Sequence, residues 1–346
     1  MSVPGTPPDH EPDTKKGASL AEVAKAAGVS RMTVSRVMRN EGRVADETRR
    51  RVLAEVERLG YVPNRIAAAF SADRASTLVG VCIPRLTSAL FGELLESIDR
   101  ALSRLGFQTM IGAHEDDPAA EAAWLRELLA WRPAGVLLTG RVHTPGATDM
   151  LRAATIPMVE MWDLNTTPLD VSIGLNHYDS GAEMARFMLS RGRRRIGYVG
   201  TARSPQTLAV KRASGFSDAL RGAGVALQGS ECLNDGASFY AGYYGMETLL
   251  NRVTNLDAIY CQNDEMAIGS LAYCSARGVR VPDDIGVAGW GGYQAAAILP
   301  RLLTTTAVPT RRIGKLSAEA LVARLRGEPV ADVQLVPAVL RPGATV

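Results

Sequence analysis

Apolar and polar positions repeat with two different periods, which divide the chain into a short helical head and a long body. Near the N-terminus, apolar residues recur three and four positions apart, as on one face of a helix. Residues 20–40 hold two such stretches separated by Gly28, and residues 46–59 hold a third. From Thr77 onward, continuous apolar runs alternate with amphipathic stretches, which is typical of buried parallel strands joined by helices.

The first two stretches predict a helix-turn-helix. Ser19 and Glu22 have the spacing of a capping box, Gly28 can end the first helix, and Ser30 can cap the second. The second helix is expected to bury Val34, Val37 and Met38, and to point outward Arg31, Met32, Ser35 and Arg36. The third helix is expected to end at Gly60 and to turn inward Val52, Leu53, Val56 and Leu59. Such a three-helix head presents its second helix to the major groove of DNA.

Charge follows the same division. Residues 15–74 carry 13 Lys and Arg against seven Asp and Glu, a net charge of +6. Residues 75–346 carry 26 of each and are neutral. A positive head on a neutral body indicates phosphate binding by the head alone, and it disfavours the alternative of a merely solvated helical hairpin.

The body predicts a doubly wound α/β fold in two lobes. The expected strands are 78–83, 108–113, 135–139, 157–161, 171–174, 195–200, 258–261 and 285–289. The expected helices are 91–105, 119–131, 149–154, 180–191, 209–223, 240–252 and 264–277. These strands are more than one sheet comfortably holds, and ligands of such folds bind where the strands end.

The expected organisation has four parts. Residues 1–17 form a disordered, Pro-rich tail, 18–64 the DNA-binding head, 65–76 a hinge helix and linker, and 77–346 the effector-binding and dimerisation body. Lobe one would comprise about 77–175 and 308–334, and lobe two about 176–307 with the C-terminal segment. The hinge helix is too short to persist alone in water. Phe70 within it either packs on the body or wedges into the minor groove.

Several classes of function are disfavoured. The chain has neither a signal peptide nor an apolar run long enough for a membrane span, which predicts a cytoplasmic protein. The four cysteines lack metal-ligand spacing and are expected to be buried thiols, so we predict no metal and no cofactor. Phosphate-loop, nucleophile-elbow and zinc-protease motifs are absent, which argues against an enzyme. The basic run 191–195 is expected at a solvated helix end.

The head and hinge resemble the LacI/GalR family of transcriptional regulators. The matching head residues are Val23, Ala24, Ala27–Ser30, Thr33–Val37 and Asn40, and the match continues through Thr48, Arg49, Leu59–Tyr61, Pro63, Asn64 and Ala67. The resemblance implies a homodimer on pseudo-palindromic double-stranded operator DNA. It places Arg31, Met32 and Arg36 at base-reading positions, Thr33, Ser35 and Asn40 at phosphates, and Phe70 at the minor-groove wedge. It extends the DNA-binding set to Asn64 and Arg65.

The body carries the resemblance as well, through Ile196–Gly200, Arg212, Gly215, Phe216, Asn263, Asp264, Ala267, Gly269, Val281–Ile285 and Gly289. Segments 139–145 and 159–163, with Trp290, look most like the gluconate-operon repressor branch. The resemblance implies a small-molecule effector held by Phe91, Arg141, His143, Glu160, Asp163, Arg212, Asn263 and Trp290.

Two departures from the family pattern bear on the effector. Most sugar-binding members carry an Asp pair where this chain has Gly291 and Gly292, and their usual Asp-Asn is Asn176 and His177 here. The pocket is therefore expected to hold fewer acids than that of most sugar-binding members. It would be cationic through Arg141, His143 and Arg212, which suits a sugar acid such as gluconate. Alternatively, Arg141 and His143 simply pair with neighbouring acids.

The predicted function is a repressor of sugar-acid catabolism or uptake genes that a small carbohydrate releases from its operator. A regulator responding to a neutral sugar, a sugar phosphate or a protein co-repressor is the alternative within the family. A solute-binding protein for uptake and a sugar-acid enzyme fused to a head are the alternatives outside it; the basic head and the missing catalytic motifs argue against them.

Overall fold

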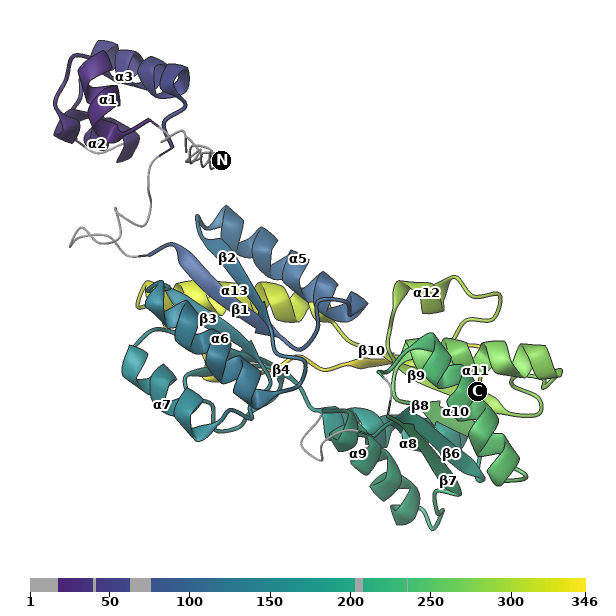
Figure 1. The fold of residues 1–346 in the computed structure, drawn as a ribbon. Helices are drawn as coiled ribbons and strands as arrows, with labels where there is room; N and C mark the ends of the chain where they lie inside the picture. The colour runs from purple at the N-terminus through teal and green to yellow at the C-terminus, as the bar shows by residue number, and fades with distance from the viewer. Residues whose placement is uncertain (1–17, 40–41, 63–75, 203–207, 235) are drawn as a thin grey trace, which may run out of the picture. The chain divides into compact units, whose positions relative to one another are not determined.

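The structure is a computed structural model that describes residues 18–39, 42–62, 76–202, 208–234 and 236–346 (Figure 1). It divides into two compact units, residues 1–75 and 76–346, which we describe separately. The predicted tail (1–17), Asn40, Asn64, Arg65 and the hinge with Phe70 lie outside the described residues. None of the described helices is long and apolar enough to cross a membrane.

The head is a cluster of three helices, α1 (Leu20–Ala26), α2 (Arg31–Arg39) and α3 (Asp46–Leu59). The capping box is confirmed, since the Glu22 amide donates to Ser19 Oγ and the Ser19 amide donates to the Glu22 carboxylate. The α1 helix ends before Gly28, whose φ of 63° is left-handed. The buried core consists of Val23, Ala24, Ala27, Val34, Val37 and Val52.

One inward-facing prediction in the head is wrong. Leu53 was expected to turn inward but is 46% exposed. Val52 is the buried residue of α3, and Val56 and Leu59 pack against the core while only partly buried. Met38 is half-buried rather than buried, and so is Ser35, which was expected outward. Three helices this short provide one narrow apolar stripe each, so the flanking positions lie at its edge.

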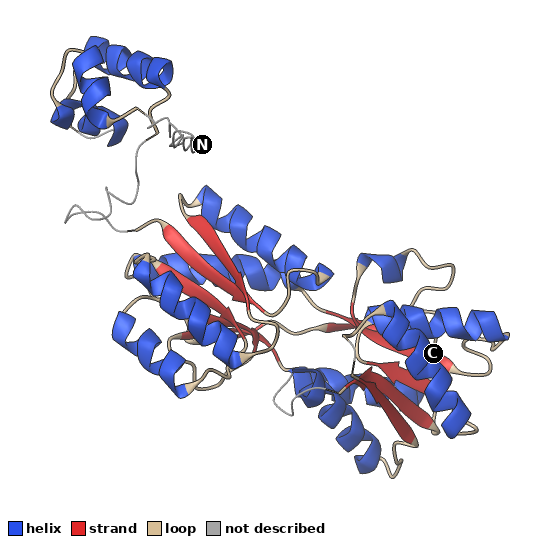
Figure 2. Ribbon diagram, viewed as in Figure 1, coloured by secondary structure: helices blue, strands red, loops and turns tan. Residues whose placement is uncertain are grey.

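Lobe one is a six-stranded parallel sheet with the order β11-β5-β4-β3-β1-β2. Helices cover both of its faces (Figure 2). Buried apolar residues of α5 and α13 belong to one core cluster, and those of α6 and α7 belong to another. Its elements are β1 (Leu78–Ile83), α5 (Ala89–Arg104), β2 (Gln108–Ala113), α6 (Pro118–Ala130), β3 (Gly135–Thr139), α7 (Pro145–Ala154), β4 (Met158–Asp163), β5 (Val171–Leu175), α13 (Thr310–Leu325) and β11 (Val333–Leu335).

Lobe two repeats this plan with the order β12-β10-β9-β8-β6-β7, in which only the β10–β12 pair is antiparallel. The α8 and α9 helices contribute to one core cluster and α10 and α11 to another. Its elements are α8 (His177–Ser190), β6 (Ile196–Thr201), α9 (Leu208–Gly222), β7 (Gly229–Leu233), α10 (Phe239–Arg252), β8 (Ala258–Cys261), α11 (Asp264–Arg277), β9 (Gly286–Gly291), α12 (Gln294–Ala297), β10 (Thr304–Ala307) and β12 (Val339–Arg341).

The chain passes between the lobes three times, after β5, after β10 and after β11. Each lobe is therefore assembled from separate stretches of sequence. The predicted α/β fold with two parallel sheets is confirmed. The strands β7, β10, β11 and β12 and the helices α12 and α13 were not predicted.

Three further expectations need correction. Cys232 is exposed, whereas Cys82, Cys261 and Cys274 are buried as expected. The helix predicted to begin at Asp149 begins at Pro145, because Thr144 caps it and a proline suits its first position. The basic run does follow a helix end, but Arg193 is half-buried and donates to the Pro282 carbonyl rather than being solvated.

Candidate functional site

The outward face of α2 is the candidate DNA-reading surface. Arg31, Met32 and Arg36 are all exposed, and Met32 is 62% exposed although it is apolar. Thr33 differs, because its amide donates to Ser30 Oγ and its hydroxyl lies 2.9 Å from the same oxygen. Ser30 therefore caps α2 as expected. The structure leaves the two arginines and Met32 available to a base edge, and it ties Thr33 to the helix end.

The body holds a pocket between its two lobes. Lobe one contributes Phe91 from α5 and Trp162 from β4, and lobe two contributes Arg212, Asn263 and Trp290. Four of the eight predicted effector residues thus come together, namely Phe91, Arg212, Asn263 and Trp290. The charged side chains Arg85, Asp116 and Glu265 also line the pocket, and all three were missed.

Arg212 is the central cation of this pocket. Its guanidinium is 3.1 Å from His177 Nδ1 and donates to the Gln262 carbonyl at 3.2 Å, and its Cζ lies 3.7 Å from the centre of the Trp290 ring. The residue is only 6% exposed, and burial lowers the pKa of its guanidinium. Among the described residues, no carboxylate forms an ion pair with Arg212. Its contacts include a neutral ring, a carbonyl and a π face.

His177 is suited to this neighbour because it is neutral. Burial, followed by the charges of Arg212 and Lys211, lowers the pKa of His177 well below its ordinary value. Since Arg212 can only donate, Nδ1 of the neutral ring accepts and the proton lies on Nε2. The backbone also accommodates Arg212 closely. A Cβ on Gly181 of α8 would lie 2.0 Å from the Arg212 carbonyl oxygen, so only glycine lets α8 and α9 approach in this way.

Aromatic rings form the wall of the pocket beside Arg212. The ring centres of Phe91 and Trp162 are 4.9 Å apart, and those of Trp162 and Trp290 are 6.4 Å apart, so the contact crosses from lobe one to lobe two. Trp290 is oriented by a 2.9 Å hydrogen bond from Nε1 to Ser180 Oγ. Trp162 has a φ of 82°, which is rare for a bulky residue and costs on the order of 1–3 kcal/mol.

Asp163 carries a second contact across the lobes. Its carboxylate binds Lys211 of α9 and lies 3.3 Å from Arg141 Nε. Burial raises the pKa of Asp163, and the two cations oppose that rise. Arg141 and Asp163, which were both predicted to hold the effector, therefore contact each other, in agreement with the alternative that Arg141 pairs with a neighbouring acid. Lys211 was missed.

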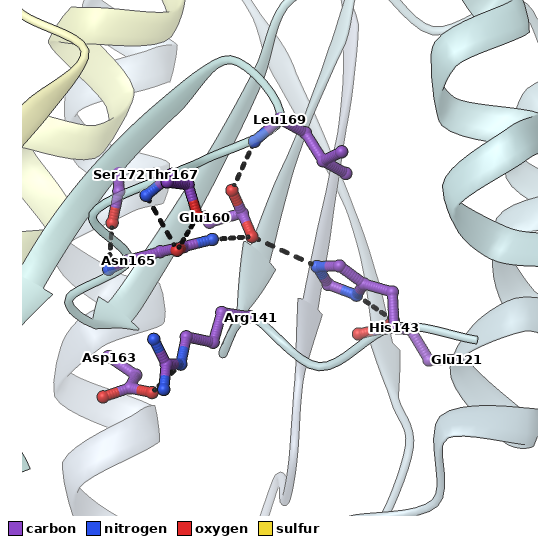
Figure 3. A network of polar contacts seen from close by, with 9 residues as sticks. All are labelled: Glu121, Arg141, His143, Glu160, Asp163, Asn165, Thr167, Leu169 and Ser172. Carbon is purple, nitrogen blue, oxygen red and sulfur yellow. Dashed lines mark hydrogen bonds and ion pairs between the residues drawn. The ribbon is translucent and has the colours of Figure 1, made fainter. Parts of the chain in front are cut away.

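His143 and Glu160 do not line this pocket. They lie with Glu121 in a buried network inside lobe one (Figure 3), where His143 Nδ1 is 2.6 Å from Glu121 Oε1. The expectation that His143 adds positive charge to the pocket is not met, because its charge is balanced by two glutamates. Glu160 was expected to face the effector, but β4 continues to Asp163, two residues past the predicted end, and leaves Glu160 within the strand.

Asn263 serves two purposes. Its Oδ1 accepts from the Met266 amide at 2.9 Å and so caps α11. The residue also lines the pocket. No group of His, Cys, Asp and Glu side chains in the described part of the chain has an arrangement that could hold a metal ion.

Together, these features define a protein class: a helix-turn-helix head attached to a two-lobed body with a pocket between its lobes. The family of bacterial regulatory proteins named lacI matches residues 19–64, and a periplasmic binding protein-like domain matches residues 185–346. The chain is 33% identical over 321 residues to the HTH-type transcriptional regulator GntR of Escherichia coli, covering 93% of this chain and 96% of the relative. The chain belongs to the lacI family and is a DNA-binding transcriptional regulator.

Solved structures agree with this assignment. A LacI family transcriptional regulator from Silicibacter pomeroyi is 38% identical with a TM-score of 0.89, over 95% of this chain and 99% of that one. The lac repressor dimer bound to operator and an anti-inducer is 25% identical with a TM-score of 0.83, over 95% and 99%. These relatives are regulators rather than enzymes.

Proposed function

We propose that this chain represses genes for sugar-acid catabolism or uptake, and that a gluconate-type sugar acid releases it from its operator. The observation that carries the proposal is Arg212, a buried cation without an ion-pair partner among the described residues, facing a pocket. A guanidinium can hold a carboxylate through two parallel hydrogen bonds. Burying a charge is costly unless it is paired, so an anionic ligand at Arg212 would compensate that cost.

The rest of the pocket suits the rest of a sugar acid. Asn263, Asp116 and Glu265 offer donors and acceptors for hydroxyl groups, and Phe91, Trp162 and Trp290 offer apolar faces. The resemblance of segments 139–145 and 159–163 to the gluconate-operon repressor branch supports the same effector class.

We further propose that the head binds operator DNA as part of a homodimer in the cytoplasm. Arg31, Met32 and Arg36 would read bases, with Arg36 best suited to guanine, while Thr33 and Ser35 would contact phosphates. For Asn40, Asn64, Arg65 and the Phe70 wedge, the proposal rests on the family resemblance. The similar lac repressor is a dimer on its operator. Lobe two exposes Phe239, Tyr240, Tyr244, Ile298 and Leu302, and we propose that these side chains contribute to the dimer interface.

The effector can be identified by testing which compound releases the protein from its operator DNA. A duplex selected in vitro with the full chain would be labelled, and its affinity followed by anisotropy while gluconate, glucose, gluconate 6-phosphate or glucitol is added. We expect gluconate to lower operator affinity by a factor of about 5–150, the range of ordinary allosteric coupling. No change with gluconate, together with release by another compound, would refute the sugar-acid effector and leave the regulator class intact.

A further inference from the structure

Lobe one contains a buried set of ionisable side chains that the proposed effector site does not use, and we call it the Glu121–His143–Glu160 cluster (Figure 3). His143 lies in the turn before α7, Glu121 on α6 and Glu160 on β4. The His143 Nδ1 contacts Glu121 at 2.6 Å, and its Nε2 lies 3.6 Å from Glu160 Oε1. All three side chains are at most 3% exposed. One imidazole thus joins a loop, a helix and a strand.

Glu160 extends this restraint to the segment that follows β4. Its Oε1 accepts from Asn165 Nδ2 at 3.0 Å, and its Oε2 accepts from the Leu169 amide at 2.8 Å. Asn165 is fixed in turn, since its amide donates to Ser172 Oγ on β5 and its Oδ1 accepts from the Thr167 amide. Residues 164–170 are therefore folded over the Glu160 carboxylate.

Trp162 lies in β4 between Glu160 and Asp163, whose side chains are both held by polar contacts. Its left-handed backbone is sustained from one side by Glu160 and from the other by Asp163, which binds Arg141 and Lys211. Gly174 of β5 leaves room for it, because a Cβ there would lie 2.8 Å from the Trp162 carbonyl oxygen. An unfavourable backbone conformation persists only where its surroundings determine it.

The charge of His143 holds the cluster together. Burial alone would lower the pKa of His143, but the hydrogen bonds and charges of Glu121 and Glu160 outweigh burial and raise it to about 9. Burial lowers the pKa of the nearby His114, and the charge of His143 lowers it further. His143 is thus a cation at neutral pH. Without it, two buried carboxylates would face each other uncompensated.

We propose that the Glu121–His143–Glu160 cluster positions the effector site: His143 sets effector affinity by holding residues 160–169, and with them Trp162, without touching the effector. The proposal rests on the effector site proposed above. It assigns His143 the part of a positioning residue rather than that of a ligand.

The first test needs no effector. Hydrogen exchange of the full chain would compare the parent with His143→Gln, which removes the cation but keeps a donor for Glu121. We expect the amides of residues 165–167 and 169 to exchange about tenfold faster in the variant, with the rest of lobe one unchanged. Unchanged protection at 165–169, or an increase spread evenly over lobe one, would overturn the proposal. The control is Arg100→Gln, which removes an exposed ion pair on α5.

The second test is rescue. Adding Glu121→Gln to His143→Gln removes one of the two uncompensated carboxylates, so we expect the double variant to regain most of the lost protection. A defect caused merely by lost packing would persist or grow. With gluconate, the single variant should bind about tenfold more weakly and the double variant within about threefold of the parent. Failure of the parent to bind gluconate would refute the proposed effector alone, since the exchange experiment decides the positioning proposal.

Discussion

Replacing Arg212 by methionine separates the role of its charge in effector binding from its role in the fold. Methionine keeps an unbranched apolar stem against Trp290 but removes the donors to His177 and Gln262. Each hydrogen bond to a charged group is worth about 1.5–3 kcal/mol, so losing a two-bond carboxylate contact costs at least about 3 kcal/mol. That corresponds to a loss of about 150-fold or more in gluconate affinity.

The stability of the unliganded body should change much less. Removing a buried charge relieves a desolvation penalty of several kcal/mol. Against this, His177 Nδ1 and the Gln262 carbonyl each lose a donor at about 1–3 kcal/mol. The two effects oppose each other, and we expect a net change within about 2 kcal/mol in the free energy of unfolding, measured in urea.

The assay is calorimetric titration of the full chain with gluconate and with glucitol, the analogue in which the carboxylate is a neutral alcohol. The parent should prefer gluconate strongly, and Arg212→Met should lose that preference while Arg212→Lys keeps part of it, because lysine retains the charge without the planar fork. The reasoning is refuted if Arg212→Met binds gluconate within about threefold of the parent, or if it loses gluconate and glucitol equally.

Three further outcomes follow. Arg36→Ala should weaken specific operator binding by about 1–3 kcal/mol and leave binding to non-specific DNA nearly intact. Both affinities would be measured by anisotropy, with Arg50→Ala on α3 as the control. Equal losses of affinity for operator and non-specific DNA would exclude base readout by Arg36. Gly174→Ala should destabilise the body by about 1–3 kcal/mol because its Cβ meets the Trp162 backbone, whereas Gly146→Ala, with nothing within 4 Å, should not; equal melting temperatures would contradict this. The pKa of His143 is raised from an ordinary 6.5 to about 9, so its stabilisation is complete below 6.5 and disappears as pH rises through about 9. Urea unfolding across that range should therefore show a steeper decline for the parent than for His143→Gln.

Local sequence signals predicted the elements that one periodic stretch defines. The strands 78–83 and 258–261 and the helix 264–277 have the predicted bounds, because each is a continuous buried run or an amphipathic stretch with a clear start. The elements that were missed lack such a signal. The β11 and β12 strands have three residues each, and β10 is mostly threonine.

The α13 helix was missed for a different reason, which is its burial on several sides. It is buried on more than one side, and its buried positions include Thr310, Gly314 and Ser317. Small and polar residues at buried positions hide the apolar stripe on which helix prediction depends. Tertiary contact with α5 and the sheet, rather than local pattern, makes these positions interior.

The effector residues were predicted from the family resemblance, and the structure brings together those whose positions the fold fixes. Asn263 lies between the end of β8 and the start of α11, and such a position faces the ligand edge of the sheet. Lys211 could not be predicted, since its partner Asp163 lies on the other lobe and no local signal sets the distance between lobes. Glu160 was also predicted from the resemblance, but β4 continues two residues past its predicted end at Met161 and leaves Glu160 within the strand.

The three passages of the chain between the lobes bear on the order of events during synthesis. Residues 19–61 can complete the head core as soon as they leave the ribosome, because all its contacts are local. Lobe one cannot close its sheet until β11 pairs with β5, and lobe two waits for β12 to pair with β10. We therefore expect nascent chains to carry a folded DNA-reading head well before they carry a finished sensor, and such chains can contact DNA but cannot yet respond to an effector.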